Sequence, residues 1–406
     1  MNRFFGNNNQ PTNKTIESNR NMNSKSFVLA GVLSLGFAGL AGASTQYIYV
    51  TGSTAARGAF YSAVTDGSTV FDAAPTFAGM GNATGSKCGY MVFSNTISGT
   101  PTIIKCTWSG SEGGIGDLAG NLSESFLVDS VTGTSASSPS SAQLTTAPVD
   151  LCAADNSKLY SKNPKSTIVG TEVCVITFAW VKEKGSASTL TDVHDAALRV
   201  ALSGGTPLAL FTGNAADTTW VYVSGRDNNS GTRVNAMGNT GYGIFGAPFM
   251  IQVNADGSML DQTGSGDILG DYGYSGGGSL ATQMGYDLSV GTSKDLLNGS
   301  GSDHFSVIAY LGRSDANTAI GASVGGTELT YNGVAIRAAA IKEGQYTFWG
   351  NEYIYHKSSP TTQALAVYNK LTATAGISSH ADGSTTIKLA DMHAVRNGPT
   401  DNPVHK

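Results

Sequence analysis

Short apolar segments alternate along the chain with turns rich in Gly, Ser and Thr. Strands are expected at residues 46–50, 102–108, 148–154, 173–181, 220–223, 307–311 and 353–355. Helical spacing predicts helices over Ala55–Val64 and Leu190–Leu202, and further helices are expected after the turns at 109–111 and 230–232. Gly276–Ser279 is either a further helix start or a plain loop. Strands that alternate with helices predict an α/β fold with mixed, mostly parallel sheets.

The first 43 residues have the pattern of a secretory signal peptide. An uncharged, mostly apolar run of 14 residues, Phe27–Leu40, follows Arg20 and Lys25 and precedes the small residues Ala41-Gly42-Ala43. A membrane-spanning helix would need about 20 apolar residues. We therefore expect residues 1–43 to be removed, with Met22 as an alternative start, and the protein to be periplasmic or extracellular.

Composition narrows the function classes. The chain has 52 Gly among 406 residues, only 13% charged residues and a formal net charge of −5. This balance argues against coiled coils and gives no basic surface for nucleic acid. The low-complexity segment 130–146 is expected to be a solvent-exposed insertion. No metal-ligand spacing, dinucleotide fingerprint or nucleophile elbow is found, so neither a metal, a cofactor nor catalysis is expected.

Four cysteines remain after the expected cleavage. An even number of cysteines in an exported chain favours disulfides. The preferred pairs are Cys88–Cys106 and Cys152–Cys174, because each flanks a short strand-loop-strand stretch. Spacing alone leaves the other pairings open, and a zinc site is the weaker alternative.

Three turns that open expected helices could hold an oxyanion together. They are Thr51-Gly52-Ser53-Thr54, Gly110-Ser111-Glu112-Gly113-Gly114 and Ser230-Gly231-Thr232. A helix N-terminus presents free N–H groups and a partial positive charge, and Gly lets a ligand approach the backbone. Taken singly, each turn is a weak signal, because Ser or Thr before a helix is more often an ordinary N-cap. Arg226, four residues before Ser230, adds a fork-shaped donor for an anion.

These turns resemble those of the periplasmic phosphate-binding proteins of ABC transporters, which have the type II solute-binding fold. The opening turn resembles the family's Gly-Ala-Thr turn, and the second its Gly-Ser-Ser-Gly-Gly turn. Val149–Asp155 resembles the family's Val-Asp-Phe-Gly-Ala-Ser-Asp stretch. Arg226–Thr232 keeps the Arg-x-x-x-Ser-Gly-Thr spacing, which is the most specific of the four.

The resemblance implies a two-lobed protein that captures inorganic phosphate, or a related oxyanion, for an ABC-transporter permease. It implies anion contacts from Thr54, Ala55, Ser111, Asp155, Arg226, Ser230, Gly231 and Thr232. Lobe I is expected from residues 46–178 and 350–395 and lobe II from 179–349, with two crossing strands as the hinge. The expected protein is a monomer and not an enzyme.

Asp155 has a physical reason to face the ligand. A carboxylate repels an anion unless the anion carries a proton to donate, which hydrogen phosphate does at neutral pH and sulfate does not. An unpaired buried acceptor costs about 1–3 kcal/mol, so Asp155 would select phosphate over sulfate. A helix-capping role for Asp155 is the alternative.

Some residues depart from the family pattern. Ala55-Ala56 replaces the usual Phe-Pro, Glu112 replaces a hydroxyl residue beside the expected anion, and Ser109 is an alternative to Ser111. Two other functions therefore stay open: a non-transport surface or matrix protein that has lost its ligand, and an exported phosphatase-like hydrolase.

Overall fold

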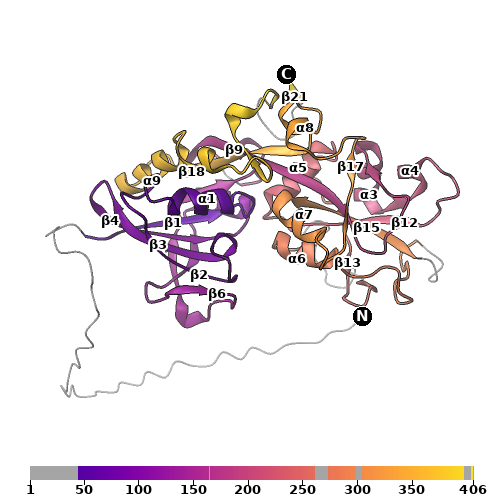
Figure 1. Ribbon diagram of the computed structural model, residues 1–406, viewed down its shortest axis with the longest axis horizontal. Helices are drawn as coiled ribbons and strands as arrows, with labels where there is room; N and C mark the ends of the chain where they lie inside the picture. The colour runs from indigo at the N-terminus through magenta and orange to yellow at the C-terminus, as the bar shows by residue number, and fades with distance from the viewer. Residues whose placement is uncertain (1–43, 164, 261–272, 299–303, 397–403, 406) are drawn as a thin grey trace, which may run out of the picture. The chain divides into compact units, whose positions relative to one another are not determined.

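The computed structural model describes residues 44–163, 165–260, 273–298, 304–396 and 404–405. The expected signal peptide, residues 1–43, lies outside this part of the chain. The described residues form one compact unit (Figure 1). It contains both strands and helices, which confirms the predicted α/β class.

Up to the middle of the chain, strands predominate. The strands are β1 (Gln46–Gly52), β2 (Thr76–Met80), β3 (Tyr90–Ile97), β4 (Thr100–Thr107), β5 (Ser123–Leu127), β6 (Gly133–Ser135), β7 (Leu144–Pro148), β8 (Leu151–Ala154) and β9 (Ile168–Lys182). The helices are α1 (Arg57–Thr65) and α2 (Ser111–Gly120), with 3-10 turns η1 (Gly85–Lys87), η2 (Ser141–Gln143) and η3 (Lys158–Tyr160).

After β9 the elements are shorter. The strands are β10 (Asp192–Val193), β11 (Thr206–Pro207), β12 (Trp220–Ser224), β13 (Gln252–Val253), β14 (Met259–Leu260), β15 (Phe305–Gly312), β16 (Thr327–Glu328), β17 (Thr330–Tyr331), β18 (Trp349–Lys357), β19 (Thr386–Ile387), β20 (Val395–Arg396) and β21 (Val404–His405). The helices and 3-10 turns are α3 (Asp195–Gly204), α4 (Ala209–Thr212), α5 (Gly231–Asn239), α6 (Gly277–Gln283), α7 (Arg313–Ala319), α8 (Ala338–Lys342), α9 (Thr362–Thr372), η4 (Ile377–His380) and η5 (Leu389–Asp391).

One mixed sheet connects most of the described chain. Its strand order is β11-β12-β15-β9-β18-β8-β1-β4-β3-β2-β6, and β16 and β19 also pair with β9. The pairs β1–β4, β1–β8, β12–β15 and β2–β6 are parallel. The central strands β9 and β18 run antiparallel to their neighbours. The expectation of mostly parallel sheets is wrong, because hairpins such as β3–β4 and the crossing strands β9 and β18 make most pairs of described strands antiparallel.

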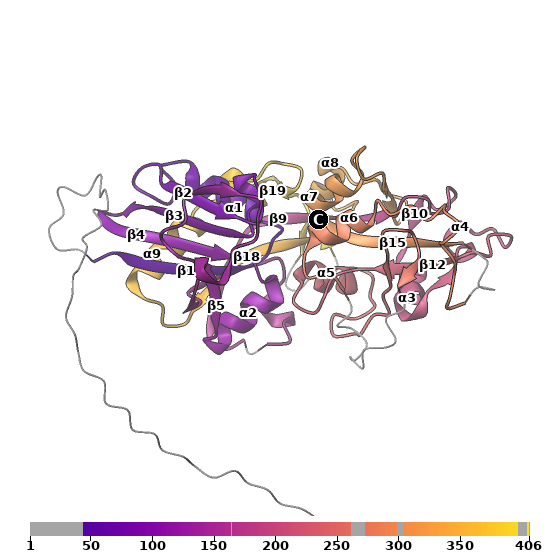
Figure 2. The ribbon, with the colours of Figure 1, turned by 90° about the horizontal axis from the view of Figure 1, so that it is seen from below.

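Strand β9 joins two parts of this sheet. Its residues Ile168–Thr177 pair with β18, and Phe178–Lys182 pair with β15. Figure 1 shows two groups of elements on either side of this junction: β1–β4 with α1 and α9, and β12 and β15 with α3 and α5–α7. Figure 2 shows helices on both faces of the sheet, with α2, α3 and α5 on one face and α1, α6 and α7 on the other.

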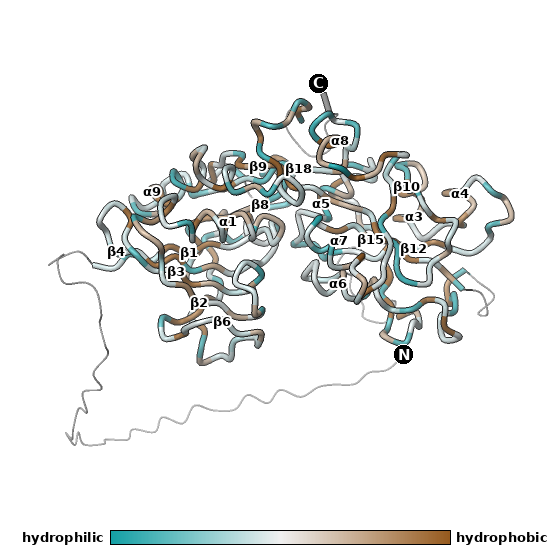
Figure 3. The backbone as a smooth tube through the Cα atoms, in the orientation of Figure 1, coloured by the Kyte–Doolittle hydropathy of each residue, from teal (hydrophilic) through white to brown (hydrophobic). Residues whose placement is uncertain are grey.

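Buried apolar side chains explain this arrangement. Hydrophobic segments follow the strands, and polar segments lie mostly in the loops (Figure 3). At the junction, the buried rings of Trp180, Tyr310 and Phe348 pack together, with centroids 5.7 Å apart for both Trp180 pairs. Buried aromatic packing of this kind fixes the crossing strands to each other.

Two expected helices begin later than predicted. Helix α1 starts at Arg57 rather than Ala55, and its cap residue Ala56 has no side chain that can accept a hydrogen bond. Helix α3 starts at Asp195 rather than Leu190, because Asp192 and Val193 pair with Thr330 and Tyr331 as strands β10 and β17. This pairing is non-local, so helical spacing could not reveal it. Gly276–Ser279 does begin a helix, α6.

The predicted disulfides are wrong, because all four cysteines are free and buried. Cys152 lies on β8 and Cys174 on β9, with β18 between them. Two strand spacings amount to about 10 Å, which exceeds the 4.4–6.8 Å between the Cα atoms of a disulfide.

The pair Cys88 and Cys106 is separated in the same way. Cys106 lies on β4, whereas the sulfur of Cys88 lies against Gly79 of β2, and β3 runs between these strands. Cys88 Sγ donates a hydrogen bond to the Asn82 carbonyl oxygen at 3.2 Å.

The low-complexity segment 130–146 is largely exposed, as a solvent-facing insertion would be. It is nevertheless ordered into short pairs: β6 lies beside β2, and β7 pairs with β5. Ser140 and Gln143 form a capping box at η2.

Candidate functional site

The candidate site lies where several strands of the sheet end. Ser111 begins α2 just after β4, and Asp155 directly follows β8. Because β4, β1 and β8 are parallel neighbours, their carboxyl ends meet at one edge of the sheet. The topology therefore brings together two residues that lie far apart in the sequence.

Ser111 and Asp155 are hydrogen-bonded in both directions. Ser111 Oγ donates to Asp155 Oδ1 at 2.6 Å and accepts from the Asp155 backbone N–H at 3.1 Å. Both residues are buried. The alternative residue Ser109 lies elsewhere, 2.8 Å from Thr51 Oγ1, so Ser111 is the hydroxyl that faces Asp155.

Helix α5 approaches this pair from the other part of the sheet. A Cβ atom at Gly231 would lie only 1.6 Å from Asp155 Oδ1 and 2.6 Å from Ser111 Oγ. Thr232 Oγ1 lies 3.5 Å from Asp155 Oδ2, and Asn235 Nδ2 donates to the Asp155 carbonyl at 2.7 Å. Glycine is thus required at the first position of α5, because any side chain would collide with the carboxyl group.

Ser230 caps α5. Its hydroxyl accepts a hydrogen bond from the Arg233 N–H at 3.3 Å, which explains the abrupt helix start after the loop at 225–229. The N-terminus of α5 holds three of the predicted site residues, and all three are buried: Ser230, Gly231 and Thr232. The partial positive charge of that terminus faces Asp155.

Arg226 is held by backbone carbonyl groups. Its Nε donates to the Tyr274 carbonyl at 2.9 Å, and its Nη2 donates to the Ser275 carbonyl at 2.8 Å. The guanidinium lies within electrostatic range of two carboxyl groups, Asp155 and Asp315. Among the described side chains it forms no direct ion pair with either, so its charge is positioned by the main chain rather than neutralised.

Burial controls the protonation of the carboxyl groups in this region. Burial raises the pKa of Asp155 from 3.8 to about 6, while the Ser111 hydroxyl and the Arg226 charge oppose the rise. Burial also raises the pKa of Asp315, and Arg226 and Arg57 oppose it. Asp155 is therefore largely ionised at neutral pH and becomes protonated in mild acid.

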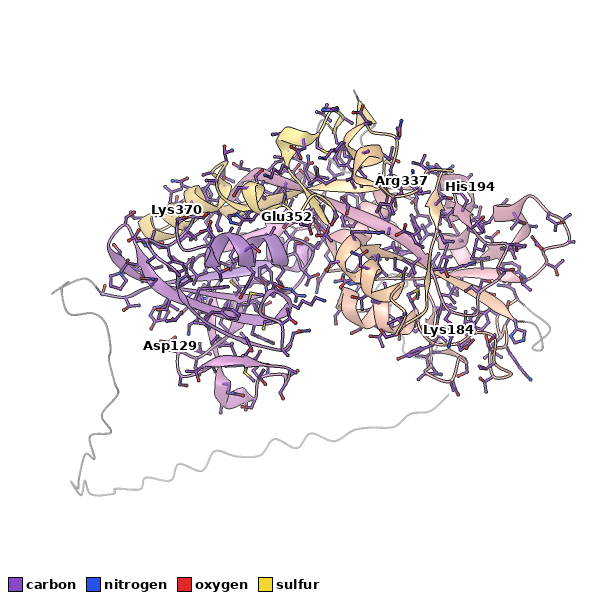
Figure 4. The ribbon with its side chains drawn as sticks, in the orientation of Figure 1. Asp129, Lys184, His194, Arg337, Glu352 and Lys370 are labelled. Atoms are coloured by element: carbon purple, nitrogen blue, oxygen red, sulfur yellow. The ribbon has the colours of Figure 1, made fainter. Side chains whose placement is uncertain are left out.

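Glu352 is a further buried acid close to the site. It lies on β18 near the crossing with β9 (Figure 4). Burial raises the pKa of Glu352 well above its usual range, the negative charge of Asp155 raises it further, and the Ser53 hydroxyl opposes the rise. Glu352 is therefore protonated more readily than an exposed glutamate.

Glu112 is directed away from Asp155. Its carboxylate accepts hydrogen bonds from Asn156 Nδ2 at 2.7 Å, from the Ser161 hydroxyl at 3.0 Å and from the Lys162 N–H at 3.1 Å. Burial raises the pKa of Glu112, and these donors oppose the rise. An acidic residue can thus occupy this position of the turn without facing an anion held by Ser111.

Thr54 and Ala55 lie apart from the hydrogen-bonded cluster. The Ala55 N–H donates to Ser53 Oγ at 3.2 Å, and both residues line a separate cavity beside α1. Within the described chain, neither residue contacts Asp155 or Arg226 by a hydrogen bond. The structure thus groups Ser111, Asp155, Gly231 and Thr232 closely and places Thr54 and Ala55 at the periphery.

Sequence reasoning did not identify Asp315, Arg57, Asn235 and Glu352 as neighbours of the site. Only Asp315 carried a local signal, because it opens α7 directly after the buried strand β15. The others depend on which elements pack together. Among the described residues, no group of three or more His, Cys, Asp or Glu could hold a metal ion. Nor does any helix in this part of the chain have the length and apolar content to cross a membrane.

The comparisons with known proteins are structural. No family model matches the chain, and no curated protein is similar to it in sequence. A protein from Clostridium perfringens, assigned as a phosphate ABC transporter substrate-binding protein and solved with bound phosphate, is 12% identical. It covers 85% of this chain and 100% of its own, with a TM-score of 0.47.

Two further solved structures are similar. PstS from Borrelia burgdorferi is 11% identical, covers 84% of this chain and 98% of its own, and has a TM-score of 0.39. An ABC-type phosphate transport receptor from Vibrio cholerae is 11% identical, covers 78% of this chain and 90% of its own, and has a TM-score of 0.38.

Proposed function

We propose that the exported chain captures inorganic phosphate between two lobes and makes or breaks no bond in it. The observation that carries this proposal is the contact set of Asp155. Ser111 approaches this carboxylate from the part of the sheet that holds β4, and Gly231 and Thr232 approach it from the part that holds β12. Arg226 adds a buried positive charge. The Asp155 carboxylate is an acceptor, and the groups around it are donors. This arrangement suits an anion that carries a proton.

Phosphate would enter between Asp155 and the N-terminus of α5. Separation of Gly231 from Asp155 would open this space, and the Ser111 hydroxyl, the α5 N–H groups and Arg226 would then donate to the phosphate oxygens. Asp155 would accept a hydrogen bond from the protonated phosphate oxygen. Sulfate has no such proton at neutral pH, so an ionised Asp155 would disfavour it.

The lobes proposed are residues 46–178 with 350–395, and 179–349. This division is supported by β9, which changes partner from β18 to β15 between Thr177 and Phe178. Strands β9 and β18 would act as the hinge. Export through the signal peptide at 1–43, a monomeric state and delivery of phosphate to an ABC-transporter permease complete the proposal.

One observation favours a second candidate. Asp155 already lies against Gly231, so the closed site has no space between these two residues. A surface or matrix protein that has lost its ligand would show the same contact. Ligand-dependent stabilisation distinguishes the two functions.

The test is thermal unfolding of the mature chain with phosphate, sulfate, molybdate or no oxyanion. Phosphate at about 100 times its Kd should stabilise the protein by roughly 2.7 kcal/mol, and sulfate should give little change. Arg226→Ala should remove this stabilisation, because it deletes the buried charge. Arg199→Ala is the matched control, since Arg199 also donates to a backbone carbonyl, that of Thr240, but lies on α3.

Two results would contradict the proposal. The absence of stabilisation by any oxyanion would favour the surface protein without a ligand. Steady release of phosphate from an ester by the pure protein would instead favour an exported phosphatase-like hydrolase.

A further inference from the structure

The orientation of Arg226 is set by the main chain at Tyr274 and Ser275. The Tyr274 carbonyl accepts from Arg226 Nε at 2.9 Å, and the Ser275 carbonyl accepts from Nη2 at 2.8 Å. The backbones of Arg226 and Tyr274 also form an isolated parallel bridge. In this bridge the Tyr274 N–H donates to the Gly225 carbonyl at 2.9 Å, and the Asp227 N–H donates to the Tyr274 carbonyl at 3.2 Å. A displacement of Tyr274 would therefore displace the guanidinium as well.

The side chain of Tyr274 is held by Gln283, a fully buried residue of α6. The Tyr274 hydroxyl donates to Gln283 Oε1 at 2.6 Å. The same oxygen accepts from the Val253 N–H at 3.3 Å and from the Ser224 hydroxyl at 3.4 Å. Because a backbone N–H can only donate, the contact with Val253 determines that the amide oxygen, and not the amide nitrogen, faces Tyr274.

Glu183 holds the nitrogen of the Gln283 amide. Gln283 Nε2 donates to Glu183 Oε2 at 3.2 Å, and Glu183 is itself buried directly after β9. The Glu183 N–H donates to the Val307 carbonyl of β15 at 2.9 Å, which attaches this residue to the sheet. A continuous series of hydrogen bonds thus leads from the sheet through Gln283 and Tyr274 to Arg226.

The surroundings of Gln283 would also accept an apolar residue. Its neighbours in the sequence, Leu280, Ala281 and Met284, belong to a cluster of buried apolar side chains. Burying an amide in such a cluster costs free energy unless the amide is hydrogen-bonded. A buried polar network whose members are bonded specifies one arrangement of the groups that it joins. For Gln283 that arrangement is the position of the Tyr274 ring.

Arg226 depends on this support because no carboxylate holds it directly. Among the described side chains it forms no ion pair, and its Nε and Nη2 donate to the two carbonyls. An Arg side chain has five N–H donors in a rigid fork. The two carbonyls each occupy one of these donors, so they set the direction in which the other N–H groups meet an anion.

We infer that Gln283 is a positioning residue of the phosphate site, because through the Tyr274 hydroxyl it fixes the carbonyl groups that orient Arg226. The inference rests on the proposed function and adds to it the residues that prepare Arg226 for the ligand. Neither Gln283 nor the Tyr274 hydroxyl needs to touch phosphate. A fork held in one orientation forms paired hydrogen bonds to an oxyanion and loses them when it turns.

Calorimetry of phosphate binding to the mature chain tests this inference. Tyr274→Phe removes only the hydroxyl and keeps both carbonyls that hold Arg226. Gln283→Leu removes the acceptor instead and is a second variant in case the first is poorly folded. Tyr222→Phe is the matched control, because the Tyr222 hydroxyl is also buried and donates to Asp295 Oδ1 at 2.9 Å, away from Tyr274.

Tyr274→Phe and Gln283→Leu should each weaken phosphate binding at least about tenfold, equivalent to about 1.4 kcal/mol, and Tyr222→Phe should stay within about twofold of wild type. Arg226→Lys lacks the guanidinium fork, so adding Tyr274→Phe to it should weaken binding less than about twofold further. A merely structural role of the hydroxyl would weaken binding equally in both backgrounds.

Two results would overturn the inference while the proposed function stands. One is wild-type affinity for phosphate in a folded Tyr274→Phe or Gln283→Leu variant. The other is an equal loss on adding Tyr274→Phe to wild type and to Arg226→Lys. If wild type itself binds no phosphate, the proposed function fails together with the inference.

Discussion

At the residue scale, Asp155 is both the proposed recognition group and a source of instability. Its carboxyl group is buried, and its pKa rises from 3.8 to about 6 on folding. The folded state therefore favours the protonated acid. Below about pH 4 this contribution to stability is fully present, and it is lost as the pH rises through about 6. A shift of this size corresponds to about 3 kcal/mol of stability.

We therefore expect Asp155→Asn to stabilise the ligand-free protein more at pH 8 than at pH 5. Asparagine keeps the shape of the side chain and removes the charge that burial disfavours. Thermal unfolding in phosphate-free buffer at both pH values measures the difference. An equal change at the two pH values would mean that the charge of Asp155 is not what burial opposes.

Gly231 is the second residue on which the structure of the site depends. Helix α5 approaches the Asp155 carboxyl group too closely at this position for any side chain. Gly231→Ala should destabilise the protein by about 1–3 kcal/mol, the usual cost of overpacking a buried position. Urea unfolding measures the loss. Gly278→Ala on α6 is the control, since a Cβ atom there meets nothing within 4 Å. Equal stability of the two variants would show that α5 and Asp155 are not in close contact.

At the scale of elements, strand order decides the state of the cysteines. Strand β18 separates Cys152 from Cys174, and β3 separates Cys106 from the strand against which Cys88 packs. Burial also raises the pKa of the Cys106, Cys152 and Cys174 thiols well above the usual range, which makes them poor nucleophiles.

Titration with a thiol reagent should therefore find four thiols per chain after unfolding without reductant, and almost none in the folded protein. Reductant should leave the thermal midpoint unchanged. Fewer than four thiols in the unfolded, unreduced protein would reveal a disulfide and contradict this strand order.

The sequence pattern predicted elements well where the signal was local. The continuous apolar run in β9 and the Ser-Gly-Thr turn that begins α5 are both present in the structure. Strands β2 and β3 were not predicted. The turn between β3 and β4 is formed by Ser98 and Gly99, which have positive φ values of 52° and 75°. An X-Gly dipeptide between two apolar segments is the local signal that could have revealed this hairpin.

At the scale of the whole molecule, the meeting of distant segments creates the site. Repeated strand–turn–helix units predicted which turns would hold Ser111, Asp155 and Ser230–Thr232. They could not predict that Arg57 of α1 and Asp315 of α7 would come within electrostatic range of each other, because that depends on how distant elements are placed in space. Nor could they show that Glu112 turns towards Asn156 and Ser161 instead of the site.

The direct test of the account is calorimetry of phosphate and sulfate binding to wild type, Asp155→Asn and Asp150→Asn. Asp150 is a matched control, since burial also raises its pKa but its carboxylate accepts from the Tyr49 N–H instead of facing α5. Wild type and Asp150→Asn should bind phosphate and reject sulfate. In Asp155→Asn, the ratio of phosphate affinity to sulfate affinity should fall at least about tenfold. If Asp155→Asn prefers phosphate over sulfate as strongly as wild type does, the claim that Asp155 recognises the proton on phosphate is contradicted.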